Sequence, residues 1–151
     1  MSASSLVRNL DMHDELLLIG IAKDSGKWYV QNASMREELL KDANGLLSIM
    51  EDDDSLIYVT PGASRYAFST KTERFEVDVV FPVLHGEYGE DGSLQGLLEI
   101  AQIPYVGPAV MGSNIAMDKE KAKILWKNSG LSIVPYLAIK KTDWNDKVKK
   151  D

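Results

Sequence analysis

The chain has 151 residues, of which 44% are hydrophobic and 26% charged, as in an ordinary globular domain with a core of its own. The net charge of −6 argues against nucleic-acid binding, which needs a basic face, and the absence of cysteine excludes disulfides and thiolate metal sites. No apolar run approaches the roughly 20 residues of a membrane helix and no signal peptide is visible, so we expect a cytoplasmic protein with no membrane partner.

The first part of the chain alternates helical and extended patterns. Residues 2–10 carry apolar side chains at helical spacing behind several serines, which predicts a short helix. Residues 16–22 form a continuous apolar run, typical of a central parallel strand buried on both faces. A turn at 24–26 then leads into residues 27–30, where aromatic and β-branched side chains predict a hairpin-like extension.

The next stretch is less regular. Residues 34–50 follow an interrupted helical pattern with a break at Asn44 and Gly45. The acidic run 51–54 is better explained as a solvated loop than as a metal site, because its carboxylates are consecutive and have no spaced partners. Residues 56–60 predict a short strand, and residues 66–69 a segment that pairs with a neighbour.

The most informative stretch joins a strand to a helix. Residues 77–84 read as a second buried strand, and the polar loop 85–96 follows directly. Apolar side chains at positions 94, 97, 98 and 101 then predict a helix capped by Asp91 or Gly92. In open α/β sheets ligands bind beyond the carboxyl ends of the strands, so the loop is the first candidate for a binding site.

The remaining pattern continues the alternation. Residues 103–107 resemble a short strand, residues 118–128 a helix, and residues 131–139 a strand with an irregular or edge position. Residues 142–150 read as a polar helix start or tail. Alternating strands and helices indicate the α/β class, and the change in composition after Gly107 indicates a domain boundary there.

The loop has the composition of an anion site. Gly86, Gly89 and Gly92 are spaced G-x-x-G-x-x-G, which is neither the dinucleotide fingerprint nor a Walker phosphate loop. A loop that opens a helix nevertheless suits a substrate carboxylate or phosphate. From chemistry alone, His85 either satisfies a backbone carbonyl or donates to an anionic substrate.

The charged residues allow two interpretations each. Glu90 and Asp91 are adjacent and rarely converge on one bond, so loop hydrogen bonds are favoured over a catalytic pair. Lys119 lies in the first turn of a helix, where a cation opposes the helix dipole. Either Asp118 and Glu120 neutralise it, or it contacts an anion such as a nucleotide phosphate.

Three consecutive blocks closely resemble the D-alanine:D-alanine ligase family: residues 84–99, 103–107 and 117–119. The resemblance implies that residues 1–107 form a substrate domain, with an open parallel sheet of the pre-ATP-grasp, Rossmann-like type. It implies that residues 108–151 are the start of an ATP-grasp domain. It implies an ATP-dependent ligase that joins two D-alanines for peptidoglycan through an acyl phosphate.

By the same resemblance, His85 and Gly86 would bind the first D-alanine. Gly89, Glu90, Asp91 and Gly92 would form the loop scaffold, and Lys119 would contact ATP. The implied cofactors are ATP and Mg²⁺ or Mn²⁺, and the implied assembly is a homodimer formed through the N-terminal domain. Family members that make D-alanyl-D-lactate or D-alanyl-D-serine share the same blocks.

The chain also departs from the family pattern. The family's opening strand and its Gly-Gly-x-Ser-x-Glu-His-Glu-Val-Ser loop are missing, as are the ATP clamp, the acidic metal ligands and the arginine that supports the acyl phosphate. No catalytic set is complete and no metal site is expected in this sequence. We therefore expect a portion of the ligase, truncated at both ends and inactive alone; the alternative is a non-catalytic binding or dimerisation module.

Overall fold

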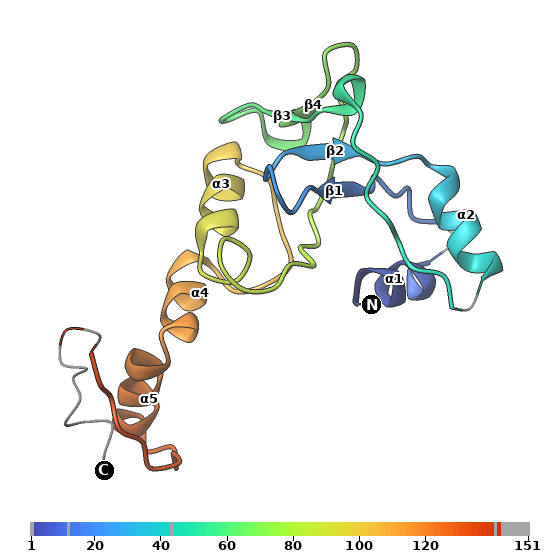
Figure 1. Ribbon diagram of the computed structural model, residues 1–151. Coiled ribbons are helices and arrows are strands. Elements are labelled where there is room, and N and C mark those ends of the chain that lie inside the picture. The colour runs from blue at the N-terminus through green and yellow to red at the C-terminus, as the bar shows by residue number, and fades with distance from the viewer. Residues whose placement is uncertain (1, 12, 43, 141, 143–151) are drawn as a thin grey trace.

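Helices and short strands alternate along the computed structural model, which describes residues 2–11, 13–42, 44–140 and 142 (Figure 1). Two single-turn 3₁₀ segments, Asp53–Ser55 and Ser64–Tyr66, flank the third strand. In chain order the helices and strands are α1 (Ser2–Asn9), β1 (Ile19–Ile21), β2 (Trp28–Val30), α2 (Ser34–Lys41), β3 (Tyr58–Val59), β4 (Phe68–Ser69), α3 (Ser93–Ala101), α4 (Val110–Met117) and α5 (Lys119–Asn128).

The regular strand ladders of the described residues are two antiparallel pairs, β1 with β2 and β3 with β4. Gly20 lies opposite Tyr29 in the first pair, which confirms the predicted hairpin-like extension. The prediction of a central parallel strand over residues 16–22 is wrong. Gly26, with φ of +67°, turns the chain back at once, so β1 pairs with its own continuation.

Parallel pairing in the described residues is limited to one bridge, between Val80 and Tyr105. The Val80 amide donates to the Pro104 carbonyl at 2.8 Å, and the Val80 carbonyl accepts from the Val106 amide at 2.9 Å. The backbone amide and carbonyl of Val80 both face residues 104–106, whereas Val79 and Phe81 are 53% and 50% exposed. The mixed α/β class is thus observed, but residues 77–84 are not the buried strand expected, because a neighbour lies on one side only.

The main core forms where α3 packs against the hairpin of β3 and β4. Leu98, Ala101, Ala67 and Phe68 are completely buried there, and Trp28 adds a tilted ring contact to Phe68 at 6.2 Å between centroids. Helix α3 presents its apolar stripe to this core, as its spacing predicted. The core therefore holds α3, whose N-terminal end the polar loop enters.

Two other expected elements differ from the structure. Helix α2 ends at Lys41, and a turn follows in which the Gly45 amide donates to the Asp42 carbonyl at 3.0 Å, so the expected helical pattern does not continue to residue 50. At Met50, the Gln31 side chain donates to the backbone carbonyl at 3.1 Å and accepts from the backbone amide at 2.8 Å. Residues 131–139 form no strand, since no described segment pairs with them. The expected polar tail at 142–150 lies outside the described residues except for Thr142.

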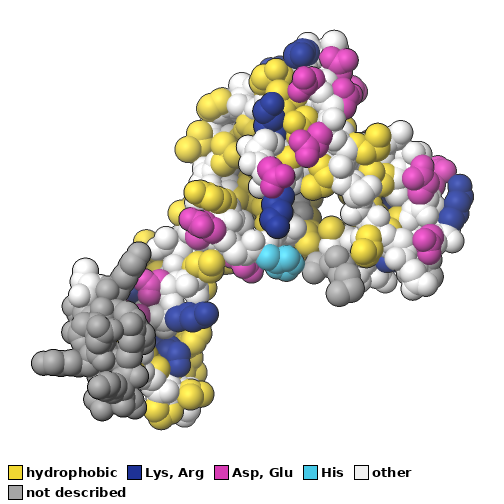
Figure 2. All heavy atoms as spheres, viewed as in Figure 1, with side chains coloured by type: hydrophobic (Ala, Val, Ile, Leu, Met, Phe, Trp, Pro, Cys, Tyr) yellow, Lys and Arg dark blue, Asp and Glu magenta, His cyan; other side chains and the backbone are white. Residues whose placement is uncertain are grey.

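Helices α3, α4 and α5 run from the core toward the C-terminal end, well away from α1 and α2 (Figure 1). Figure 2 shows hydrophobic side chains interspersed with charged ones across the visible face, so apolar surface is open on the described molecule. Within the described ranges, no helix combines the length and apolar character needed to cross a bilayer.

Replacing Leu98 with alanine tests the α3 core. Leu98 is fully buried, so we expect a loss of about 2 to 5 kcal/mol in the free energy of unfolding, from lost transfer energy and the cavity left behind. Urea denaturation followed by circular dichroism measures it. Ile100→Ala is the matched control, because Ile100 is on the same helix and 63% exposed. Equal effects of the two substitutions would contradict the assignment of this core.

Candidate functional site

The loop after residues 77–84 begins with a tight turn between Gly86 and Glu90. The Glu90 amide donates to the Gly86 carbonyl at 3.0 Å, and the Gly86 amide donates to the Glu90 carboxylate at 2.6 Å. Gly86 has a φ of +78°, a left-handed conformation that favours glycine. The Glu90 carboxylate is thus engaged by the backbone of its own loop.

Asp91 binds the other half of the loop. Its carboxylate accepts from the Tyr88 amide and from the Ser93 amide, each at 2.9 Å. These hydrogen bonds stabilise the ionised form and hold the pKa of Asp91 below its usual range. Tyr88 itself has a φ of +65°, an unfavourable conformation for a residue with a side chain, which the hydrogen bond to Asp91 helps to hold.

Two glycines let the loop lie close to its neighbours. A Cβ atom at Gly89 would lie 2.5 Å from the Cβ of Leu84, and one at Gly92 would lie 2.8 Å from the Val110 carbonyl oxygen on α4. Gly92 is the N-cap residue of α3 and has a φ of +94°. The buried Gln95 side chain donates to the Gly89 carbonyl at 3.1 Å, which fixes the loop on α3.

His85 lies at the exposed start of this loop, at the end of residues 77–84. Gly86, the other residue predicted to bind substrate, follows it and is partly buried. The structure therefore brings the predicted substrate residues together with the scaffold residues 89–92 in one loop at the N-terminal end of α3. Tyr88, also in this loop, is 70% exposed.

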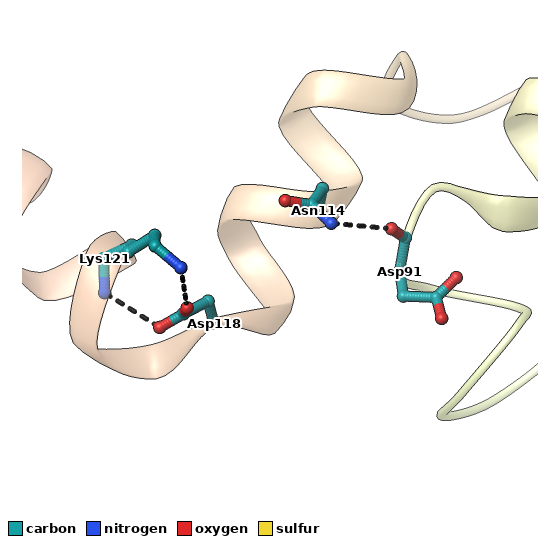
Figure 3. Close-up of polar contacts among 4 residues, drawn as sticks. All are labelled: Asp91, Asn114, Asp118 and Lys121. Atoms are coloured by element: carbon teal, nitrogen blue, oxygen red, sulfur yellow. Dashed lines mark hydrogen bonds and ion pairs between the residues drawn. The ribbon is translucent and has the colours of Figure 1, made fainter. Parts of the chain in front are cut away.

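Lys119 is the first residue of α5, on a different element from the loop. Asp118 caps this helix and accepts from the Lys121 amide at 3.0 Å and from the Lys121 ammonium at 2.5 Å (Figure 3). The pairing lowers the pKa of Asp118 and raises that of Lys121. Asp118 is thus engaged by Lys121, not by the exposed Lys119, which weakens the interpretation that Asp118 neutralises Lys119.

No group of three or more His, Cys, Asp or Glu side chains in the described part of the chain is placed to hold a metal ion. An open hollow of about 500 Å³ lies instead beside α5. Its lining residues are Ile124, Lys127, Asn128, Ile133, Pro135 and Tyr136. None of these was a predicted site residue, and we assign the hollow no role, because its walls carry exposed apolar side chains without a converging polar set.

Sequence reasoning missed the residues that connect the loop to its surroundings. Gln95 could have been suspected, since a glutamine among the apolar positions of α3 needs a hydrogen-bonding partner when buried. Asn114 on α4 donates to the Asp91 carbonyl at 3.4 Å across 23 residues of sequence, and no local pattern indicates that contact (Figure 3).

A protein-family model described as the D-ala D-ala ligase N-terminus matches residues 1–108, which is more than half of the chain. The chain belongs to the D-alanine–D-alanine ligase family. A family member from Treponema denticola, named D-alanine--D-alanine ligase, is 47% identical over 99% of this chain, and the Treponema pallidum protein of the same name is 44% identical over 95%. This chain spans 40% and 36% of the lengths of those two ligases.

Solved structures of family members agree with this assignment. The D-alanine-D-alanine ligase from Coxiella burnetii aligns over 99% of this chain and 42% of its own, with 29% identity and a TM-score of 0.79. The VanG D-Ala:D-Ser ligase from Enterococcus faecalis aligns over 87% of this chain and 37% of its own, with 34% identity and a TM-score of 0.66. The described chain thus corresponds to a part of the ligase fold.

The acceptor role of Asp91 predicts a pH dependence. The pKa of Asp91 is lowered in the folded protein, so Asp91 of the unfolded chain takes up a proton first as the pH falls. The ionised Asp91 carboxylate therefore stabilises the fold fully at pH values above the usual pKa of an aspartate, and this stabilisation is lost as the pH falls through the lowered pKa. We expect the free energy of unfolding to decrease below about pH 4, and Asp91→Asn to make that decrease smaller.

Urea denaturation between pH 7 and pH 3 measures both effects. Asp53→Asn is the control, because Asp53 is exposed and its carboxylate takes part in none of the described hydrogen bonds. Identical pH profiles for wild type and Asp91→Asn would show that the Asp91 carboxylate does not stabilise the loop.

Proposed function

We propose that this chain is the D-alanine-binding part of an ATP-dependent ligase that joins two D-alanines into the dipeptide used in peptidoglycan. The observation that carries the proposal is the loop 85–96, whose glycines and carboxylates hold it rigidly while His85 stays accessible at its start. Membership of the family supplies the reaction class, and the relatives' names supply the substrate.

Within the loop, His85 donates a hydrogen bond to the carboxylate of the first D-alanine, and Gly86 leaves room for the substrate beside the backbone. Gly89, Glu90, Asp91 and Gly92 are the scaffold that keeps both in place. Both carboxylates already accept backbone hydrogen bonds, which makes them poor candidates for a general acid or base.

Lys119 contacts a phosphate of ATP in this proposal. The exposed ammonium lies at the N-terminal end of α5, where backbone amides also favour an anion, and its acidic neighbour Asp118 is paired with Lys121. A cation at this position stabilises the charge that develops as the terminal phosphoryl group moves from ATP to the substrate carboxylate. The amine of the second substrate then displaces phosphate and forms the amide bond.

The described residues do not fit a Mg²⁺ site, since no three potential ligands converge among them. We propose that the ligands of the metal, like the remaining ATP contacts, belong to other parts of the ligase. The 151-residue chain is inactive alone under this proposal, and phosphate release from ATP that depended on D-alanine would contradict that.

The domain assignment follows the same proposal. Residues 1–107 form a pre-ATP-grasp substrate domain. In the complete ligase a further parallel strand lies beside Val79 and Phe81, because the backbone groups of these two residues make no hydrogen bond to other backbone groups in the described chain. Residues 108–151 begin the ATP-grasp domain.

We also place the enzyme in the cytoplasm, where ATP is available, as a homodimer formed through the N-terminal domain. Because one relative is named a D-Ala:D-Ser ligase, the second substrate is D-alanine or a close analogue.

A second candidate is a non-catalytic binding or dimerisation module built from the same domain. The exposed apolar side chains of Val79 and Phe81 favour it, because such side chains on a strand edge mark surfaces that associate. Titration of the purified chain separates the two candidates. Binding of D-alanine supports the substrate domain, whereas self-association without any D-alanine binding supports the module.

Substitution of His85 tests the substrate site. His85→Ala removes a hydrogen bond to a charged group, which should weaken D-alanine binding to the chain roughly tenfold or more. Isothermal titration calorimetry measures the dissociation constant. His13→Ala is the matched control, because His13 is exposed and is the other histidine of the sequence. An unchanged affinity in His85→Ala would remove His85 from the site.

Substitution of Lys119 tests the nucleotide contact in a complete ligase that contains this chain. Lys119→Ala should raise KM for ATP or lower kcat about fivefold to tenfold, because a charge-assisted hydrogen bond to phosphate is lost. Lys127→Ala, near the opposite end of the same helix, controls for the loss of a positive charge from α5. Kinetics equal to wild type in Lys119→Ala would leave that residue without a role in ATP binding.

A further inference from the structure

A continuous set of contacts joins the substrate loop to the start of α5. The Asn114 side-chain amide donates to the Asp91 carbonyl at 3.4 Å, and the Asn114 carbonyl accepts from the Asp118 amide at 3.3 Å. The Asp118 carboxylate in turn accepts from Lys121, as Figure 3 shows. The Asn114 side chain thus joins α4 to the loop, and the Asn114 carbonyl accepts the last helical hydrogen bond of α4, where that helix meets α5.

A second contact holds the same elements together. Gly92, in the loop, lies so close to α4 that a Cβ atom there would come within 2.8 Å of the Val110 carbonyl. Helix α4 is itself tied to the chain before it, because the completely buried Ser113 donates from its hydroxyl to the Pro108 carbonyl at 3.3 Å. The backbone of α4 therefore rests on the loop at one end, while Asn114 binds the loop one turn later.

We propose that Asn114 is a positioning residue that fixes α4, and with it the N-terminal end of α5, against the loop 85–96. Its side chain binds the Asp91 carbonyl of the loop, and its backbone carbonyl binds the Asp118 amide before α5. Loss of the side-chain amide leaves the α4–α5 connection intact and loosens the attachment of both helices to the loop, which the Gly92 contact alone then maintains. The inference rests on the proposed function, in which His85 in the loop and Lys119 on α5 serve one reaction.

The consequence for the site is geometric. His85 and Lys119 lie on separate elements, and a transfer between their ligands requires a defined separation. Asn114 and the Gly92 contact hold that separation before any ligand binds. A side-chain hydrogen bond of this kind contributes little to overall stability, so its removal should change the relative position of the helices more than the folding equilibrium.

The experiment measures the distance between loop and α5 in the full chain without ligand. The sequence contains no cysteine, so Glu87→Cys and Lys127→Cys, both at exposed positions, give unique sites for spin labels. Pulsed electron paramagnetic resonance then yields the distance distribution. We expect one narrow distribution in the parent, and a broadened or shifted one with Asn114→Ala and with the isosteric Asn114→Asp, which removes the donor and places a carboxylate at the carbonyl.

Two controls separate positioning from general destabilisation. Asn128→Asp makes the same chemical change on α5, where the asparagine side chain makes no described hydrogen bond, and should leave the distribution as in the parent. Gly92→Ala and Gly130→Ala both place alanine at a positive φ, but only the former meets α4, so only Gly92→Ala should broaden the distribution. Circular dichroism verifies that each variant is folded.

The results distinguish the positioning role of Asn114 from the proposed function on which it rests. Loss of the hydrogen bond should lower the ratio of docked to undocked α4 about fivefold. A narrow, unshifted distribution in both folded Asn114 variants would overturn the positioning role, whatever the ligand measurements give. Absence of D-alanine binding in a parent chain whose Asn114 variants do broaden would overturn the proposed function and leave the positioning role standing.

Discussion

The packing of α3 against the hairpin of β3 and β4 is the contact on which the rest of the described structure depends. Leu98 and Ala101 are completely buried against Ala67 and Phe68, and full burial of one leucine contributes about 1.5 to 3 kcal/mol. This contact orients the first turn of α3, to which the polar loop is attached. The loop can carry strained residues because its far end is anchored in a dry core.

From that anchor the site is built by backbone hydrogen bonds to carboxylates. Glu90 and Asp91 each accept from amides that the turns of the loop leave without helical partners. The glycines permit the close approaches, and the carboxylates compensate the exposed amides. The Glu90 and Asp91 carboxylates therefore maintain the shape of the loop, and His85 lies exposed at its start. Beyond the loop, Asn114 extends the same rigidity to α4 and α5.

Elements that depend on local chemistry could be predicted from the sequence. The helices α1, α3 and α5 follow from apolar spacing and caps, and the turn before β2 follows from its glycine. Extended segments were harder, because strand pairing depends on which partners are available. Residues 16–22 were expected beside parallel neighbours and instead pair with β2, and residues 131–139 have no partner among the described residues.

By itself, the sequence determined the family, the loop 85–96 and the residue types at its site, because glycines, a histidine and adjacent carboxylates leave a local pattern. Only the tertiary structure decided what each group contacts. It showed that Asp118 pairs with Lys121 and not with Lys119, and that Asn114 reaches Asp91. Adjacent charges compete for partners by geometry, and contacts between distant segments follow from packing, so neither can be read from spacing alone.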